Sequence, residues 1–150
     1  MLLKFFSMNG NHHEPGGPDY LLANETARVV RGDPDFTKWA IHHSPSGLRQ
    51  RFTAGVINDL TELDRRHDKK LLDELQRMFL AGRPESSMVW CVIEHTDKGK
   101  RELHFVVVIF DLCFGKHVHP YIDVIDRHGF AAWAEHFALL HGLKTPLDKL

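Results

Sequence analysis

The sequence predicts an α+β fold in which a single, mainly antiparallel sheet of about five strands is covered by helices. Three observations support this prediction. The 150 residues are 43% hydrophobic and 26% charged, which are the proportions of one globular domain, here residues 1–150. Short apolar runs alternate with segments of helical spacing. The two clearest strands, 88–95 and 102–109, are separated by a short segment that contains a hairpin signal.

The N-terminal half is expected to contain strands, helices and two loops. Glycines and prolines mark residues 7–18 as a loop, and a second loop begins at Ser44. Asp33 and Pro34 suit the N-cap and the first position of a helix. The expected strands are 2–6, 27–31 and 52–57, and the expected helices are 19–23 and 33–43.

The C-terminal half is expected to combine the hairpin with two helices. Apolar residues recur at roughly helical spacing over 62–80, and Gly82 and Pro84 end that segment. A short strand is expected around 117–122. The last helix is expected over 130–143, and its buried face should carry Phe130, Trp133, Phe137 and Leu140.

Charge and cysteine content limit the class of protein. Nineteen basic and twenty acidic residues give a net charge of −1, which excludes a uniformly basic nucleic-acid surface but not a local basic patch. Cys91 and Cys113 lie in apolar stretches, where a buried free thiol is expected rather than a disulfide. No apolar run approaches the roughly 20 residues of a membrane span. The expected location is the cytoplasm, with no membrane segment.

Twelve histidines are the unusual feature of the composition, and the hairpin places two of them together. If Lys98 and Gly99 form the turn, His95 lies opposite Glu102, and His104 shares their face of the sheet. Cross-strand Cβ atoms about 5 Å apart allow such side chains to meet at one ion. Two imidazoles and a carboxylate suit Mn²⁺, Zn²⁺ or Ni²⁺ better than Mg²⁺.

The alternative is an ordinary hairpin whose solvent face carries these polar residues. Against it, Val106 and Val108 continue the face of His104, so this face runs into a core. Tyr20, which follows a glycine-rich loop, has a similar alternative as an aromatic anchor for a short helix.

Segments along nearly the whole chain resemble the relaxases that mobilise small colicin-type plasmids, in the HUH-like superfamily. The similar segments are Lys4–Phe6, Gly16–Leu22, Val29–Pro34, Phe52–Val56, Glu94–Val106, Gly115–Lys116 and Pro120–Tyr121.

The resemblance implies a site- and strand-specific relaxase of the HUH endonuclease type. Tyr20 would attack single-stranded DNA at a plasmid transfer origin, form a covalent 5′-phosphotyrosine and later religate the strand. His95, Glu102 and His104 would bind a divalent ion, with Mn²⁺ or Mg²⁺ expected first and Zn²⁺ or Ni²⁺ as alternatives. Accessory mobilisation proteins would be partners. The colicin-plasmid clade usually has asparagine at the third ligand position, where this chain has His104.

Other residues have weaker assignments. Candidates for DNA contact, each with an alternative as an ordinary surface charge or an exposed pair, are Arg28, Arg31, Lys98, Lys100, Arg101, His117 and His119. Trp39, Trp90 and Trp133 are candidates for base stacking, but we expect all three in the core. The alternative functions are a rolling-circle replication initiator, a non-catalytic single-stranded DNA-binding module and a structural zinc domain.

Overall fold

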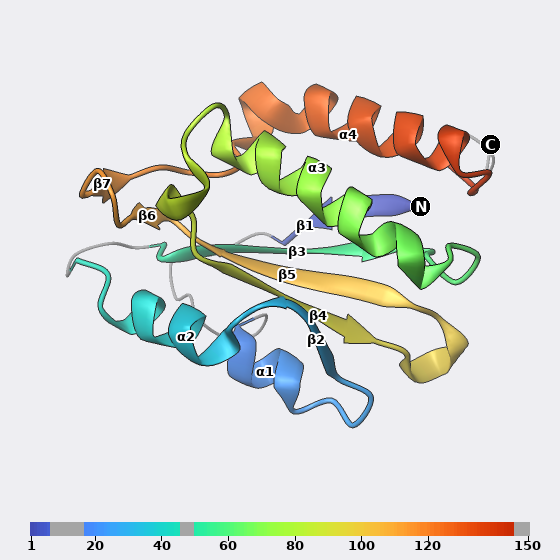
Figure 1. Cartoon of the computed structure of the whole chain (residues 1–150), viewed down its shortest axis with the longest axis horizontal. Helices are drawn as coiled ribbons and strands as arrows, with labels where there is room; N and C mark the ends of the chain where they lie inside the picture. The colour runs from blue at the N-terminus through green and yellow to red at the C-terminus, as the bar shows by residue number, and fades with distance from the viewer. Residues whose placement is uncertain (7–16, 46–49, 146–150) are drawn as a thin grey trace.

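The computed structural model describes residues 1–6, 17–45 and 50–145. Within these residues, five strands form one antiparallel sheet in the order β1-β3-β5-β4-β2, which confirms the predicted fold class (Figure 1). The loop expected over 7–18 lies largely outside the described residues, as does part of the loop that follows Ser44. The strands are β1 (Leu2–Phe5), β2 (Arg28–Gly32), β3 (Phe52–Asn58), β4 (Trp90–His95) and β5 (Glu102–Val108).

Helices cover both faces of this sheet. Figure 1 shows α1 (Pro18–Leu22) and α2 (Pro34–His42) below the sheet, and α3 (Asp68–Leu80) and α4 (Asp123–Leu140) above it. A two-stranded ribbon of β6 (Phe110–Asp111) and β7 (Lys116–His117) continues from β5. The short 3-10 turns are η1 (Arg65–His67), η2 (Glu85–Ser87) and η3 (Asp97–Gly99). Among the described residues, no helix has the length and apolar character needed to cross a membrane.

The predicted N-terminus of α2 is confirmed at its cap. The Asp33 carboxylate accepts hydrogen bonds from the backbone N–H groups of Asp35 and Phe36, at 2.9 and 3.4 Å, and Pro34 occupies the first turn. These contacts satisfy N–H groups that have no partner within the helix.

Two helices and one strand differ from their predicted bounds. The helix predicted from residue 62 begins at Asp68, because the Asp64 carboxylate accepts from the Arg66 N–H and caps a 3-10 turn first. The helix predicted from residue 130 begins at Asp123, where the Ile122 N–H donates to Asp126. The strand expected around 117–122 is reduced to β7.

Each face of the sheet has its own hydrophobic core. The larger core, beneath α3 and α4, includes Leu72, Leu75, Phe79, Phe105 and Phe137. The smaller core lies between the sheet and helices α1 and α2, and it includes Leu21, Ile41, Phe52, Cys91 and Val106. The alternation of side chains along β4 and β5 separates the two sets.

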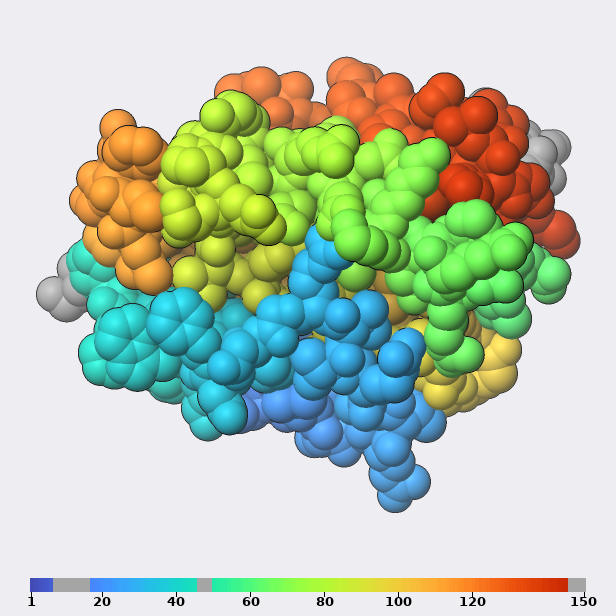
Figure 2. All heavy atoms as spheres, viewed as in Figure 1, coloured from blue at the N-terminus to red at the C-terminus, as the bar shows by residue number. Residues whose placement is uncertain are grey.

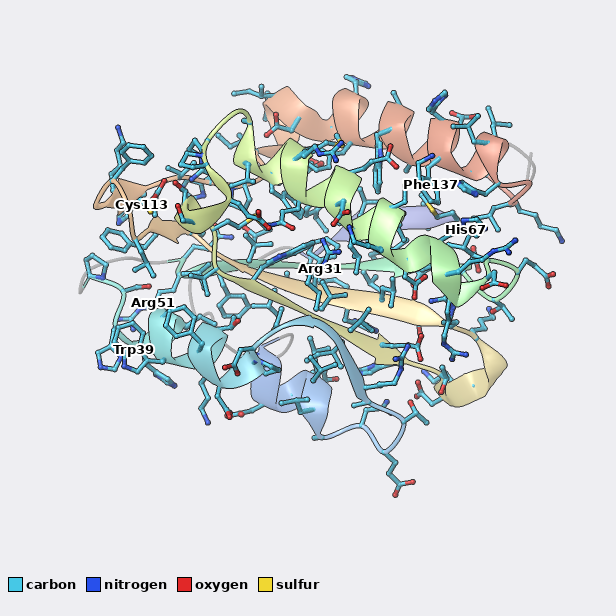
Figure 3. The ribbon with its side chains drawn as sticks, viewed as in Figure 1. Arg31, Trp39, Arg51, His67, Cys113 and Phe137 are labelled. Atoms are coloured by element: carbon cyan, nitrogen blue, oxygen red, sulfur yellow. The ribbon has the colours of Figure 1, made fainter. Side chains whose placement is uncertain are left out.

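Three residues that the sequence predicts to be buried, Cys113, Trp39 and Leu140, are instead exposed. Cys91 is buried as expected, and burial raises the pKa of its thiol to about 11. Cys113 is exposed near the β6–β7 ribbon (Figure 3), because that ribbon extends beyond the sheet. Trp90 is buried as expected, whereas Trp39 lies on the outer side of α2.

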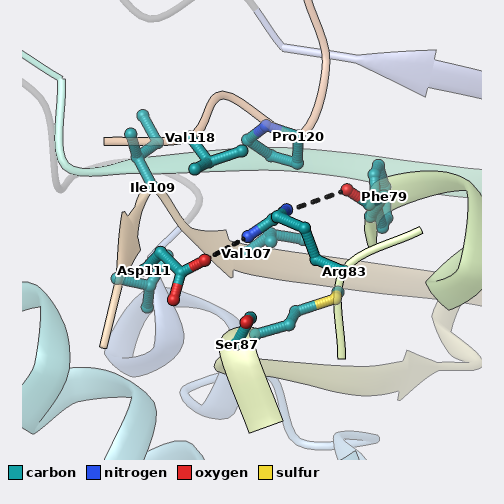
Figure 4. A pocket seen from close by; sticks show the side chains of 10 residues that line it. Phe79, Arg83, Ser87, Val107, Ile109, Asp111, Val118 and Pro120 are labelled. Carbon is teal, nitrogen blue, oxygen red and sulfur yellow. Dashed lines mark hydrogen bonds and ion pairs between the residues drawn. The ribbon is translucent and has the colours of Figure 1, made fainter. Parts of the chain in front are cut away.

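An ion pair between Arg83 and Asp111 connects the β6–β7 ribbon to the C-terminal end of α3 (Figure 4). Arg83 donates to the buried Asp111 carboxylate at 2.8 Å and to the carbonyl oxygens of Phe79 and Leu80. Asp111 also accepts from the backbone N–H groups of Cys113 and Phe114. These hydrogen bonds satisfy carbonyl groups at the C-terminal end of α3 and backbone N–H groups in the tight turn after Asp111.

We expect Gly55→Ala to destabilise the domain, because Gly55 lies at the closest approach between β3 and its neighbours. An added Cβ would overlap the Phe105 ring and lie 2.6 Å from the Lys4 carbonyl oxygen. Such overpacking costs about 1–3 kcal/mol. Urea denaturation provides the measurement. Gly129→Ala is the matched control: Gly129 lies inside α4 with open space around it, so alanine should stabilise the helix by about 0.5–1 kcal/mol. Equal effects at the two positions would contradict the prediction.

Candidate active site

The β4–β5 hairpin has the predicted register. His95 pairs with Glu102, and Ile93 pairs with His104. The predicted turn residues, Lys98 and Gly99, both have positive φ angles, of 64° and 69°. Positive φ at both central residues is typical of a tight hairpin connection. His95, Glu102 and His104 therefore project from the same face of the sheet, the face that α1 and α2 cover.

The two histidines contact each other between the sheet and α1. Their ring centroids are 4.3 Å apart, and the His95 Nε2 lies 2.8 Å from the Leu21 carbonyl oxygen. A carbonyl oxygen can only accept, so the Nε2 of His95 donates here, and in the neutral imidazole the lone pair lies on Nδ1. A metal-ligating histidine is oriented in this way by a backbone carbonyl. Leu21 is buried, which fixes that carbonyl.

His104 has a nitrogen without a partner. Its Nδ1 is buried and receives no hydrogen bond from the described residues. Burial, helped by the neighbouring His95, lowers the pKa of His104 to about 4. The imidazole is therefore neutral at pH 7, which is the form that binds a metal ion. An orphaned buried nitrogen next to a correctly oriented imidazole fits the donor set predicted for a divalent ion.

Glu102 is partly exposed beside this pair, opposite His95. In the described ranges, no group of three or more His, Cys, Asp or Glu side chains converges as metal ligands do. The structure thus brings the two predicted imidazoles together and places the predicted carboxylate on their face of the sheet.

The two tyrosines of the chain have different environments. Tyr20 lies on α1, directly before Leu21, and its side chain is 61% exposed. Tyr121 stacks on Phe5 with centroids 3.6 Å apart, and its hydroxyl donates to Asp123. Burial and that hydrogen bond raise the pKa of Tyr121 to about 12. Tyr20 is the more exposed of the two tyrosines.

Local sequence explains the position of α1. Pro18 starts the helix, Leu21 packs in the smaller core, and Asp19 forms a 2.8 Å ion pair with Lys38 of α2. The helix is therefore held from the sheet side and from α2 while Tyr20 faces outward.

The opposite face of the same hairpin holds an ionic network that the sequence did not indicate. Glu94, adjacent to His95 but on the other face, is buried and accepts hydrogen bonds from Arg28, Arg65 and Arg101. Burial raises the pKa of a carboxyl group, but the hydrogen bonds from Arg65 and Arg28 outweigh it and lower the pKa of Glu94 to about 2. A glutamate ending an otherwise apolar strand is the one signal in the sequence for this network.

Arg101 links this network to α3. Its guanidinium donates to the buried Asp68 at 2.8 Å and to the carbonyl oxygens of Leu60 and Leu63. Arg101 is therefore a buried residue, and not the surface cation that the sequence suggested.

The other predicted DNA-contact residues are dispersed. Arg31 pairs with Asp73 of α3 at 2.8 Å and lies over the Trp90 ring (Figure 3). Lys98 and Lys100 are exposed at the hairpin tip. His117 and His119 are exposed, and His117 pairs with Phe110 in the β6–β7 ribbon, beyond the end of β5.

The fold and site define an antiparallel-sheet domain. In this domain a histidine pair lies between the sheet and a helix that exposes a tyrosine. The chain belongs to the family of the cryptic plasmid protein C of Neisseria gonorrhoeae, with which it is 32% identical over 99% of its length and 73% of the relative. It is also 31% identical to the DNA relaxase MbeA of Escherichia coli, over 97% of its own length. That match spans 29% of MbeA. No family model and no solved structure matches the chain.

We expect Glu94→Gln to destabilise the domain by about 3 kcal/mol at pH 7, because it leaves the arginines around it without their shared carboxylate. The pKa of Glu94 is lowered from 4.5 to about 2, so its stabilisation is complete above pH 4.5 and is lost as the pH falls toward 2. The difference between wild type and variant should narrow over this range in urea denaturation. Glu62→Gln, at an exposed position, is the control. A difference that does not change with pH would contradict the role of the charge.

Proposed function

We propose that this domain is the nicking and strand-transfer domain of a plasmid relaxase, with Tyr20 as the nucleophile. One observation carries the proposal: the hydrogen bond from His95 to the Leu21 carbonyl holds the histidine pair beneath the residue next to Tyr20. The similarity to a protein named DNA relaxase over 97% of the chain supports it. Because the chain covers 29% of that relative, the activity of the whole relative belongs to this proposal and not to the comparison.

The proposed reaction exchanges one phosphodiester for another. The Tyr20 oxygen forms a bond to the phosphorus of single-stranded DNA, and the bond from phosphorus to the 3′ oxygen breaks. The phenol loses its proton and the departing 3′ oxygen gains one. The products are a 5′-phosphotyrosine and a free 3′-hydroxyl. Religation is the reverse reaction, and it needs no added energy source because the number of ester bonds does not change.

The proposed metal ligands are His95, Glu102 and His104. A bound Mn²⁺ or Mg²⁺ would withdraw charge from the non-bridging oxygens of the scissile phosphate, and Zn²⁺ or Ni²⁺ are alternatives. The chain's own residues prepare this position. The Leu21 carbonyl fixes the tautomer of His95, and burial keeps His104 neutral.

Single-stranded DNA at a transfer origin is the proposed substrate, and accessory mobilisation proteins are proposed partners. Lys98 and Lys100, exposed at the hairpin tip, are proposed to contact phosphates near the histidine pair. With the chain's net charge of −1, binding would depend on such local contacts and not on a general basic surface.

We expect Tyr20→Phe to abolish covalent attachment of DNA. The substrate is a set of single-stranded oligonucleotides tiled across the transfer origin, each labelled at its 3′ end and incubated with Mn²⁺ or Mg²⁺. Wild type should move the label to the protein in a denaturing gel, because the 5′-phosphotyrosine retains the 3′ portion of the strand. A 5′ label should instead appear on a shorter free strand.

Tyr121→Phe is the matched control, since it removes the hydroxyl of the other tyrosine, and it should retain the adduct. An adduct that persists in Tyr20→Phe would remove Tyr20 from the mechanism. Salt-sensitive DNA binding without any adduct, at every metal tested, would favour the non-catalytic binding module.

We expect His104→Ala to weaken Mn²⁺ binding by at least about 10-fold, measured by calorimetry on the protein without DNA. His136→Ala, at an exposed position on α4, should bind Mn²⁺ like wild type. Chelation should leave the circular dichroism spectrum unchanged, because the two hydrophobic cores are formed by helices and sheet alone. Unfolding upon chelation would indicate a structural zinc domain instead.

A further inference from the structure

Helix α2 carries three stacked rings on its outer side. Phe36 and Trp39 are 46% and 48% exposed, and their ring centroids are 5.7 Å apart with planes 8° from parallel. Trp39 stacks in turn on His43, with centroids 4.4 Å apart and planes at 19°. The His43 Nδ1 lies 2.9 Å from the Trp39 carbonyl oxygen, which fixes that ring. We call Phe36, Trp39 and His43 the aromatic ladder. Figure 2 shows ring side chains of this cyan segment at the surface.

The ladder differs from the core aromatic residues in its exposure, although parallel stacking also occurs beside the larger core, between Phe5 and Tyr121. In the larger core, Phe79 meets Phe5 at 84° and Trp90 at 78°, which are the edge-to-face contacts that fill a protein interior. The ladder rings are nearly parallel and half exposed, so they present flat faces at the surface. Burial in the core therefore does not account for the spacing of these residues along α2.

One cationic side chain, Lys38, belongs to α2, and another, Arg51, contacts its last turn. Lys38 leaves α2 beside Trp39 and reaches Asp19, next to Tyr20, at 2.8 Å. The Arg51 guanidinium lies 3.5 Å from the Ile41 carbonyl oxygen in the last turn of the helix. The acidic groups of α2 are in its first turn, where Asp33 is engaged in capping and Asp35 is exposed.

We propose that the aromatic ladder is a stacking platform for the unpaired bases of single-stranded DNA. Flat aromatic faces beside cations are the combination that binds single strands without reading their sequence. The inference rests on the proposed function, because it places the ladder along the strand whose scissile phosphate reaches Tyr20. The Lys38–Asp19 pair joins α2 to the helix of Tyr20, so the ladder and the tyrosine lie on neighbouring helices.

The experiment measures binding of a 12-nucleotide oligothymidylate to the Tyr20→Phe protein in chelator, where no cleavage occurs. Trp39 is the exposed one of the chain's three tryptophans, since Trp90 is buried and Trp133 is partly buried. Stacking should therefore quench the tryptophan fluorescence. Trp39→Phe should lose the quenching but keep the affinity measured by fluorescence anisotropy of a labelled strand. Trp39→Leu, which has bulk but no aromatic face, should weaken binding at least about 5-fold.

Leu139→Ala is the control, because Leu139 is 67% exposed on α4, across the sheet from the ladder. Thermal melting should show that all three variants are folded. Equal affinity of Trp39→Leu and wild type would overturn the inference and favour a protein partner for the ladder. Loss of affinity in Leu139→Ala equal to that in Trp39→Leu would also overturn it.

The outcomes separate this inference from the proposed function. Covalent attachment through Tyr20 combined with unchanged binding in Trp39→Leu would refute the ladder alone. Ladder-dependent binding without any covalent adduct would refute nicking and leave the platform in place. No binding of the oligothymidylate by any form of the protein would overturn the ladder, while the adduct assay on origin oligonucleotides would decide nicking separately.

Discussion

The register between β4 and β5 is the constraint on which the rest of this domain depends. Side chains alternate along a strand, so neighbouring residues of β4 serve opposite faces: Glu94 meets arginines on the α3 side, and His95 meets α1. A slip of one residue would bury the imidazole against the arginines and turn the carboxylate toward α1. The same pairing of β4 with β5 therefore produces both polar sites, and a change of register would disrupt both.

The energetics of the two sites differ. Glu94 and Asp68 are buried with Arg101, and Arg28 and Arg65 reach Glu94 from the surface, so each carboxylate has a cationic partner. Hydrogen bonds from the arginines lower the pKa of Glu94, whereas burial still raises the pKa of Asp68. Such a network adds little stability over apolar residues but is costly to break, and it specifies which segments meet. The histidine pair is compensated only in part, because one buried nitrogen has no partner among the described residues. An incompletely satisfied buried group calls for an explanation, and a bound ion or water is one such explanation.

Sequence reasoning was most reliable where the information was local. The hairpin needs only its turn and the strand alternation, so the shared face of His95, Glu102 and His104 followed from a few residues. The cap of α2 followed in the same way from Asp33 and Pro34. The partners of Glu94 come from residues 28, 65 and 101, and no pattern in one chain indicates that they converge.

Other differences have the same origin. The early start of α4 depends on a side-chain contact to Ile122, and helical periodicity alone does not show it. Trp39 matches the spacing of a buried residue, but α2 already buries Ala40 and Ile41, and its remaining aromatic side chains stay outside. Hydrophobicity indicates which residues prefer burial, and the number of places available on a short helix decides which of them obtain it.

The brevity of α1 determines how the domain handles its exposed tyrosine. The helix has five residues. Among the residues that the structure describes, it has no side-chain cap at its N-terminus, and its attachments include Leu21 in the core, the bond from His95 and the Asp19–Lys38 pair. An element with so few contacts opens locally at a small fraction of the free energy that unfolds the sheet. Its backbone amides would exchange with solvent while those of β5 remain protected. Tyr20 therefore sits on a part of the molecule that can yield to a bulky strand without disturbing the framework beneath it.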